Sequence, residues 1–126
     1  MDWLNIANVA VLVVAAAHIY AGFKEMTDWP RMAKRLAGIP IEHGEATKVI
    51  GWNQGLYNLL FAAGLIIGVF GSLFGLTGSE ASTLKVFCLC ALAGAGIGAY
   101  VSMGNVMIMA MQTGLSGIAL LLIWFS

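Results

Sequence analysis

The sequence predicts an all-α protein built as a bundle of four membrane-spanning helices, on three observations. First, 60% of the 126 residues are hydrophobic and only 10% are charged, whereas a soluble domain is about 45–50% apolar and about 25% charged. Second, nine of the twelve charged residues fall within residues 24–48, which leaves four long charge-free runs. Third, these runs lack the apolar–polar alternation of barrel strands, and only helices and closed barrels satisfy their own backbone in lipid.

The predicted helices cover about residues 3–23, 49–76, 84–103 and 105–126 of a single domain, 1–126. About 20 apolar residues suffice to cross the hydrocarbon core. No charge separates the last two helices, so a tight hairpin is predicted at the local turn formers Ser102, Gly104 and Asn105. Ser79 or Ser82 is predicted to cap the third helix. The first helix is expected to be retained, because it begins Met-Asp and lacks the basic start of a signal peptide.

The connection at residues 24–48 sets the predicted orientation. It carries five of the six Lys and Arg residues, and basic connections stay on the cytoplasmic side. Both termini are therefore predicted outside, in a multi-pass protein of the bacterial inner membrane. Within the connection, Asp28 as cap, Pro30 in the first turn and Gly38 as stop predict a short helix. This segment would be either a helix that lies at the membrane interface or a solvated loop.

Small residues recur at helical spacing on two of the predicted helices. Such stripes allow helix backbones to approach closely, within one bundle or between copies. The stripes are Gly64, Gly68, Gly71 and Gly75 on the second helix, and Ala91, Gly94, Ala95, Gly98 and Ser102 on the third.

The sulfur-containing residues predict packing rather than a metal site. Cys88 and Cys90 are two apart on a helix, so they face different ways and are expected to be buried, inert thiols. Met103, Met107 and Met111 form a stripe that could offer thioethers to copper(I), but this stripe is expected on the face opposite Gln112. No metal site, cofactor or catalytic residue is identified.

Polar residues at membrane depth are costly and usually functional, and here they recur on three helices. At 100° per residue, His18 and Glu25 share a face of the first helix, and Gln112 shares one with Asn105 and Ser116 on the last. The predicted ligand-binding cluster, at the cytoplasmic end, is His18, Glu25, Asn53, Gln54, Tyr57, Asn58 and Gln112. His43, just before the second helix, is expected to face solvent.

Several functions remain compatible with this cluster. Its side chains could simply hydrogen-bond across helices, or bind a small ligand or lipid head group, relay a proton or ligate a metal. The chain could also be an accessory subunit of a larger membrane complex, or form a homo-oligomer. In every case the lipid bilayer is a predicted partner. An enzyme or transporter is less favoured, because no arginine lies inside a membrane run and Glu25 lies near the interface. Formal neutrality excludes nucleic-acid binding.

Several motifs carry a resemblance to a known family. These are His18, the Glu25-Met26 pair followed by Trp29, the run from Asn53 to Asn58 (Asn-Gln-Gly-Leu-Tyr-Asn), and Gln112. Together they resemble a family of small four-helix bacterial membrane proteins known only as a domain of unknown function. That family often has a proline shortly after the glutamine, and this chain has none. The resemblance implies four membrane helices with the motif residues gathered on the first, second and fourth, and it implies no activity.

Overall fold

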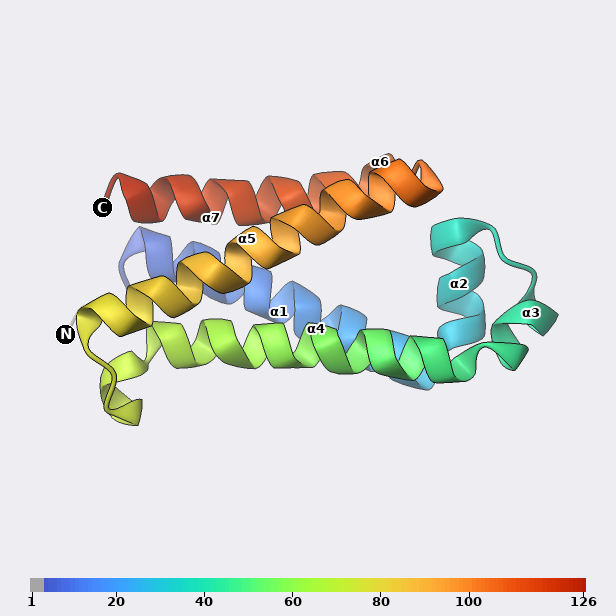
Figure 1. Ribbon diagram of the computed structural model, residues 1–126, viewed down its shortest axis with the longest axis horizontal. Helices are drawn as coiled ribbons and strands as arrows, with labels where there is room; N and C mark the ends of the chain where they lie inside the picture. Colours follow the sequence, from blue (N-terminus) through green and yellow to red (C-terminus); the bar gives the residue numbers. More distant parts are fainter. Residues whose placement is uncertain (1–3) are drawn as a thin grey trace.

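The structure, a computed structural model, describes residues 4–126, which form only helices and the turns between them (Figure 1). The first long helix is α1 (Ile6–Thr27), whose N-cap Asn5 accepts a hydrogen bond from the backbone of Asn8 at 2.8 Å. It runs past the predicted end at residue 23, since Lys24 and Glu25 keep helical geometry. It ends before Pro30, which cannot donate to a preceding turn. Trp3, the predicted first residue, lies outside the described residues.

The charged connection folds into two short helices, α2 (Trp29–Ala37) and α3 (Ile41–Ala46). The predicted short helix is thus present, with Pro30 in its first turn and Gly38 in the left-handed conformation at its end (φ 68°). Asp28 is the N-cap residue, as predicted, but its side chain makes no capping hydrogen bond and instead lies 3.6 Å from Arg31. The helix α3 has no counterpart among the predicted elements. Figure 1 shows α2 standing crosswise to the long helices at the end of the molecule away from both termini.

The second long helix, α4 (Lys48–Val69), returns along α1, and its close approach depends on two glycines. A Cβ on Gly22 would lie 2.8 Å from the carbonyl oxygen of Gly55, and a Cβ on Gly55 would collide with the carbonyl oxygen of Gly22. The predicted helix 49–76 is shorter than expected. It ends at Val69 and is followed by a 3-10 turn, η1 (Gly71–Phe74), which Gly75 closes at φ 75°.

The third long helix, α5 (Gly78–Met103), begins six residues before the predicted residue 84. Its cap is Thr77, not Ser79 or Ser82: the Thr77 hydroxyl accepts from the backbone of Glu80, whose carboxylate accepts from the backbone of Thr77 at 2.8 Å. This reciprocal capping box satisfies two terminal donors at once. Gly104, at φ 65°, ends the helix and makes the predicted hairpin turn.

The last helical rod has three parts, α6 (Val106–Met109), a π turn, η2 (Ala110–Gly114), and α7 (Leu115–Trp124). Asn105 caps α6, accepting from the backbone of Ile108 at 2.9 Å. The rod therefore departs from regular α-helix at residues 110–114 although no proline follows Gln112. A π turn holds more residues per turn than an α-helix and changes which side chains share a face downstream.

One hydrophobic core joins the four long rods. Figure 1 shows α5 leaving α4 near the N-terminal end of the molecule and crossing to meet α6 and α7 at the other end. The fully packed region lies in the half away from α2 and consists of Val11, Val14, Ala15, Ala62, Leu65, Val69, Cys88, Leu89, Leu92 and Ala119. Three helical segments are long and apolar enough to cross a membrane: Ile6–Thr27, Gly78–Met103 and Val106–Trp124. The helix α4 has the length, but its polar first half lowers its mean hydropathy.

The two small-residue stripes differ in whether a neighbouring helix covers them. A Cβ on Gly64 would contact Cys88, and one on Gly71 would contact Ala81, so α5 covers this stripe. Gly75 is not part of it, since it lies in the turn. On α5 the stripe is largely uncovered, with open space beside Gly94 and Gly98. Cys88 is buried as expected, whereas Cys90 is exposed, which corrects the expectation that both thiols are buried.

Candidate functional site

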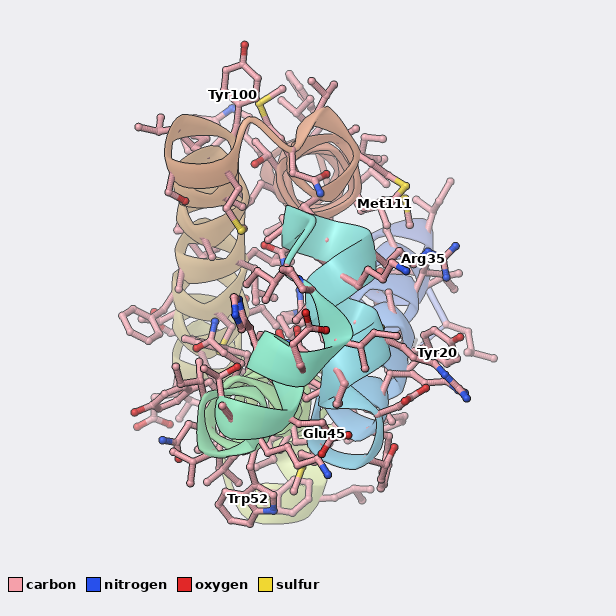
Figure 2. The ribbon with its side chains drawn as sticks, turned by 90° about the vertical axis from the view of Figure 1, so that its right-hand side faces the viewer. Tyr20, Arg35, Glu45, Trp52, Tyr100 and Met111 are labelled. Carbon is pink, nitrogen blue, oxygen red and sulfur yellow. The ribbon has the colours of Figure 1, made fainter. Side chains whose placement is uncertain are left out.

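A cleft of about 370 Å³ opens near the α2 end of the molecule, between α1, α2 and the last helical rod. Its volume is within the range of about 300–1,000 Å³ typical of small-molecule sites. We call it the α2 cleft. Its lining residues are Ala17, His18, Tyr20, Ala21, Glu25, Met32, Arg35, Leu36, Met107, Ile108, Met111, Gln112 and Leu115. Figure 2 looks onto this end and shows Tyr20, Arg35 and Met111 on the same side of the molecule.

The cleft exists because α1 is covered unevenly near α2. On one face, Gly22 and Gly55 bring α4 against α1. On the other, the last helical rod contacts α1 chiefly through the core around Ala119, farther from α2. The helix α2 is fixed across this end by two hydrogen bonds: Trp29 Nε1 donates to the Thr47 hydroxyl at 3.0 Å, and Asn105 Nδ2 donates to the Leu36 carbonyl at 2.6 Å.

The lining is mostly apolar, with polar groups at distinct depths. Glu25 and Arg35 lie at the α2 end, whereas His18 is seven residues earlier on α1, which corresponds to about 10 Å along the helix axis. Gln112 approaches from the opposite wall, on the π turn. The cleft can therefore hold a molecule that has an apolar body and at least one polar group.

The predicted cluster is divided by the structure. Three of its members, His18, Glu25 and Gln112, line the α2 cleft. Asn58 lies on the α4 side of Glu25 and donates from Nδ2 to Oε2 of that carboxylate at 2.6 Å. Asn53, Gln54 and Tyr57 are exposed on α4 and do not line the cleft. The polar sector of α4 spans about 140° by helical geometry, too wide for all four residues to face α1.

His18 is the most buried polar residue of the cleft, at 4% exposure. Its Nδ1 donates to the carbonyl oxygen of Val14 at 2.8 Å, and its Nε2 has no hydrogen-bond partner. The Ser116 hydroxyl, on α7, is also buried and without a partner. Buried polar atoms nearly always have partners in folded proteins, and of these two atoms only His18 Nε2 belongs to a residue that lines the cleft, where a further molecule would fit the chemistry.

The predicted position of the methionine stripe is wrong. Met107 and Met111 line the same cleft as Gln112 rather than the opposite face. The expectation assumed 100° per residue, but the π turn at Ala110–Gly114 contains both Met111 and Gln112 and widens the helix there. Met32, on α2, adds a third thioether to the lining. Flexible methionines give a cleft walls that adapt to different apolar shapes.

Several residues that shape this region have no counterpart among the predicted site residues. Arg35 and Met32 lie in the predicted short helix but were not predicted to line a site, and the close contact between Gly96 and Thr113, whose hydroxyl donates to the Ala93 carbonyl at 2.8 Å, was not predicted. The proximity of the short helix to Glu25 in the sequence was the available signal. His43 is exposed, as expected, and does not line the cleft. Within residues 4–126, no three His, Cys, Asp or Glu side chains are grouped as a metal site would require.

One comparison with known proteins gives a match. The model of a family described as "Protein of unknown function (DUF1304)" matches residues 12–124, nearly the whole chain. No curated protein and no solved structure matches the chain.

Proposed function

The chain belongs to the DUF1304 family of proteins of unknown function, and we propose that it is a four-span membrane protein that binds an amphipathic small ligand or lipid in the α2 cleft. The observation that carries the proposal is the composition of that cleft. Charged groups lie at its α2 end, apolar side chains make its walls, and a buried imidazole with an unpartnered nitrogen lies deeper.

The position of α2 supports a ligand that enters from the membrane interface. Its charged side chains Arg31 and Lys34 are exposed away from the cleft, whereas Met32 and Leu36 line it and the exposed Arg35 lies at its edge. A crosswise helix with this division is typical of one that lies in the interfacial plane. If the four long rods run along the membrane normal, α2 lies at the level of the lipid head groups, and the cleft beneath it opens toward lipid.

The proposed membrane arrangement places residues 24–48 in the cytoplasm and both termini outside, in the inner membrane. Basic residues concentrated in this connection support that orientation. The fourth span would be α4, which is as long as α1 at 22 residues. Its polar first half is partly accommodated inside the protein, since Asn58 bonds Glu25.

Filling the cleft tests the binding proposal. The variant Ala21→Phe places a ring in the cleft from α1, whereas Ala16→Phe, at an exposed position on the same helix, is the matched control. Native mass spectrometry of protein released from micelles containing phosphatidylethanolamine and phosphatidylglycerol is expected to show one retained lipid or small adduct per chain. The adduct should be absent in Ala21→Phe and present in Ala16→Phe. Equal retention by both variants would place the bound molecule elsewhere.

An accessory subunit is the second candidate, and the uncovered face of α5 favours it. Gly94 and Gly98 have open space where a neighbouring helix could approach, and small residues four apart are common at contacts between membrane helices. Purification in a mild detergent should then yield the protein together with a fixed partner. The Gly94→Leu variant should lose this partner, whereas the control variant Gly117→Leu, on α7, should retain it. A clean monomer from native membranes would count against this function.

A further inference from the structure

The hydrogen bond of His18 fixes the chemical character of its other ring nitrogen. A backbone carbonyl can only accept, so the contact of 2.8 Å between Nδ1 and the Val14 oxygen requires the proton on Nδ1. In the neutral ring, Nε2 then carries a lone pair and acts as an acceptor. The ion pairs between described residues are Arg31 with Asp28 and Lys48 with Glu45, so no carboxylate holds His18 as a cation.

Among the described residues, this acceptor has no hydrogen-bond partner. Nε2 is buried and unpartnered although His18 lines the α2 cleft. Ala17 and Ala21 on α1 and Leu115 on the opposite wall are apolar, and the polar side chains Gln112 and Ser116 of the last rod make no hydrogen bond to Nε2. Leaving a buried acceptor unpaired is costly, so a molecule that supplies a donor at this depth gains affinity over one that does not.

We propose that the α2 cleft selects an apolar molecule bearing a hydroxyl group, an alcohol or phenol, whose hydroxyl donates to His18 Nε2. This inference rests on the proposed function and names the ligand class. The hydroxyl would lie about 10 Å deeper than the Glu25 level, given seven residues at 1.5 Å each, so Arg35 and Glu25 remain free to contact water or a second polar group. The adaptable walls from Met32, Met107 and Met111 tolerate different apolar bodies.

A pair of matched probes tests the inference in the unmodified cleft. The probes are 1-dodecanol and dodecyl methyl ether. Both have a dodecyl chain and one oxygen that can accept a hydrogen bond, but only the alcohol can donate one. The protein is placed in phosphatidylcholine nanodiscs with ¹³C-methyl methionine and ¹⁵N-histidine. The chain has two histidines, and His43→Gln, at an exposed position outside the cleft, leaves His18 as the only ¹⁵N-imidazole.

The two labels report different events. Methyl shifts of Met107 and Met111 report occupancy of the cleft, and the Nε2 resonance reports the hydrogen bond. Both probes are expected to shift the methyl resonances, only the alcohol is expected to move Nε2, and the alcohol should bind about tenfold more tightly than the ether. In His18→Ala the preference should vanish while ether binding persists. The wild-type comparison does not depend on that variant folding.

The outcomes separate this inference from the proposed function. Equal binding of both probes with an unmoved Nε2 would overturn the hydroxyl inference and leave the binding proposal standing. An Nε2 that is already hydrogen-bonded before either probe is added, and that neither probe changes, would assign the nitrogen to a trapped water or to the Ser116 hydroxyl and overturn the inference as well. Unshifted methyl resonances with both probes would count against the binding proposal itself.

Discussion

At the scale of single residues, the link between α1 and α4 at the cleft depends on Glu25 and Asn58. The Asn58 amide donates to the carboxylate at 2.6 Å, and both residues are half-buried. Asn53, Gln54 and Tyr57, in the same motif, point outward. Among the polar residues of the motif, one therefore stabilises the position of a cleft side chain and three lie on the surface of α4.

Removing the Asn58 amide is expected to destabilise the protein. In Asn58→Ala the carboxylate of Glu25 loses its donor in a partly desolvated site, and hydrogen bonds to charged groups contribute about 1.5–3 kcal/mol. Partial exposure reduces the expected loss to about 1–2 kcal/mol. Thermal unfolding in detergent measures it, with Gln54→Ala, an exposed neighbour without a hydrogen bond, as the control. Equal unfolding temperatures for the two variants would show that the Glu25–Asn58 bond contributes nothing.

At the scale of elements, the crossing of α1 and α4 is set by the absence of two side chains. Gly22 and Gly55 place the backbones of the two helices in contact, and the atoms that a Cβ at either position would meet include a carbonyl oxygen of the other helix, which cannot move aside. This crossing presses α4 onto one face of α1 and leaves the opposite face to the cleft. The position of the cleft is thus a consequence of where Gly22 lies on α1 and Gly55 on α4.

A methyl group at this crossing is expected to separate the helices. Gly55→Ala should cost about 1–3 kcal/mol, as overpacking does in tightly packed interiors. Gly94→Ala is the matched control, because it lies in mid-helix with open space around it, and alanine there should be neutral or stabilising by up to about 1 kcal/mol. Unfolding in a denaturing detergent compares the two. A Gly55→Ala protein as stable as Gly94→Ala would contradict the close crossing.

The elements at the α2 end are connected through Asn105. Its side chain caps α6 through the backbone of Ile108 and also reaches the Leu36 carbonyl at the end of α2. One residue thereby holds the hairpin turn and the crosswise helix together. The cleft is consequently enclosed by three segments that are distant in the sequence, around residues 18–25, 32–36 and 107–115.

At the scale of the whole molecule, the number of membrane spans decides on which side of the membrane the cleft opens. If α4 crosses the membrane, residues 24–48 and the turn before α5 lie on opposite sides. Figure 1 agrees with such an arrangement, because α2 and α3 lie at one end of the long axis and η1 at the other. The same arrangement places the start of α1 and the end of α7 at the end of the molecule away from α2.

Side-specific labelling tests this topology. In a background with Cys88 and Cys90 replaced by alanine, Ser79→Cys should react with a membrane-impermeant maleimide in intact spheroplasts. Glu45→Cys should react only after permeabilisation. Both positions are exposed, so the protein itself does not block the reagent. Labelling of both cysteines from the same side would exclude α4 as a span.

The sequence by itself determined the helical class, the hairpin at Gly104 and the short helix after Asp28, because hydropathy, capping and turn preferences act over a few residues. It did not determine which faces meet. Asn58 hydrogen-bonds Glu25 while its motif neighbours point outward, because the glycine crossing sets the rotation of α4 against α1. Met107 and Met111 line the same cleft as Gln112, because the π turn sets the rotation of the last rod. Those rotations depend on contacts between segments remote in sequence. Only the tertiary structure therefore decided where the cleft lies and which side chains face it.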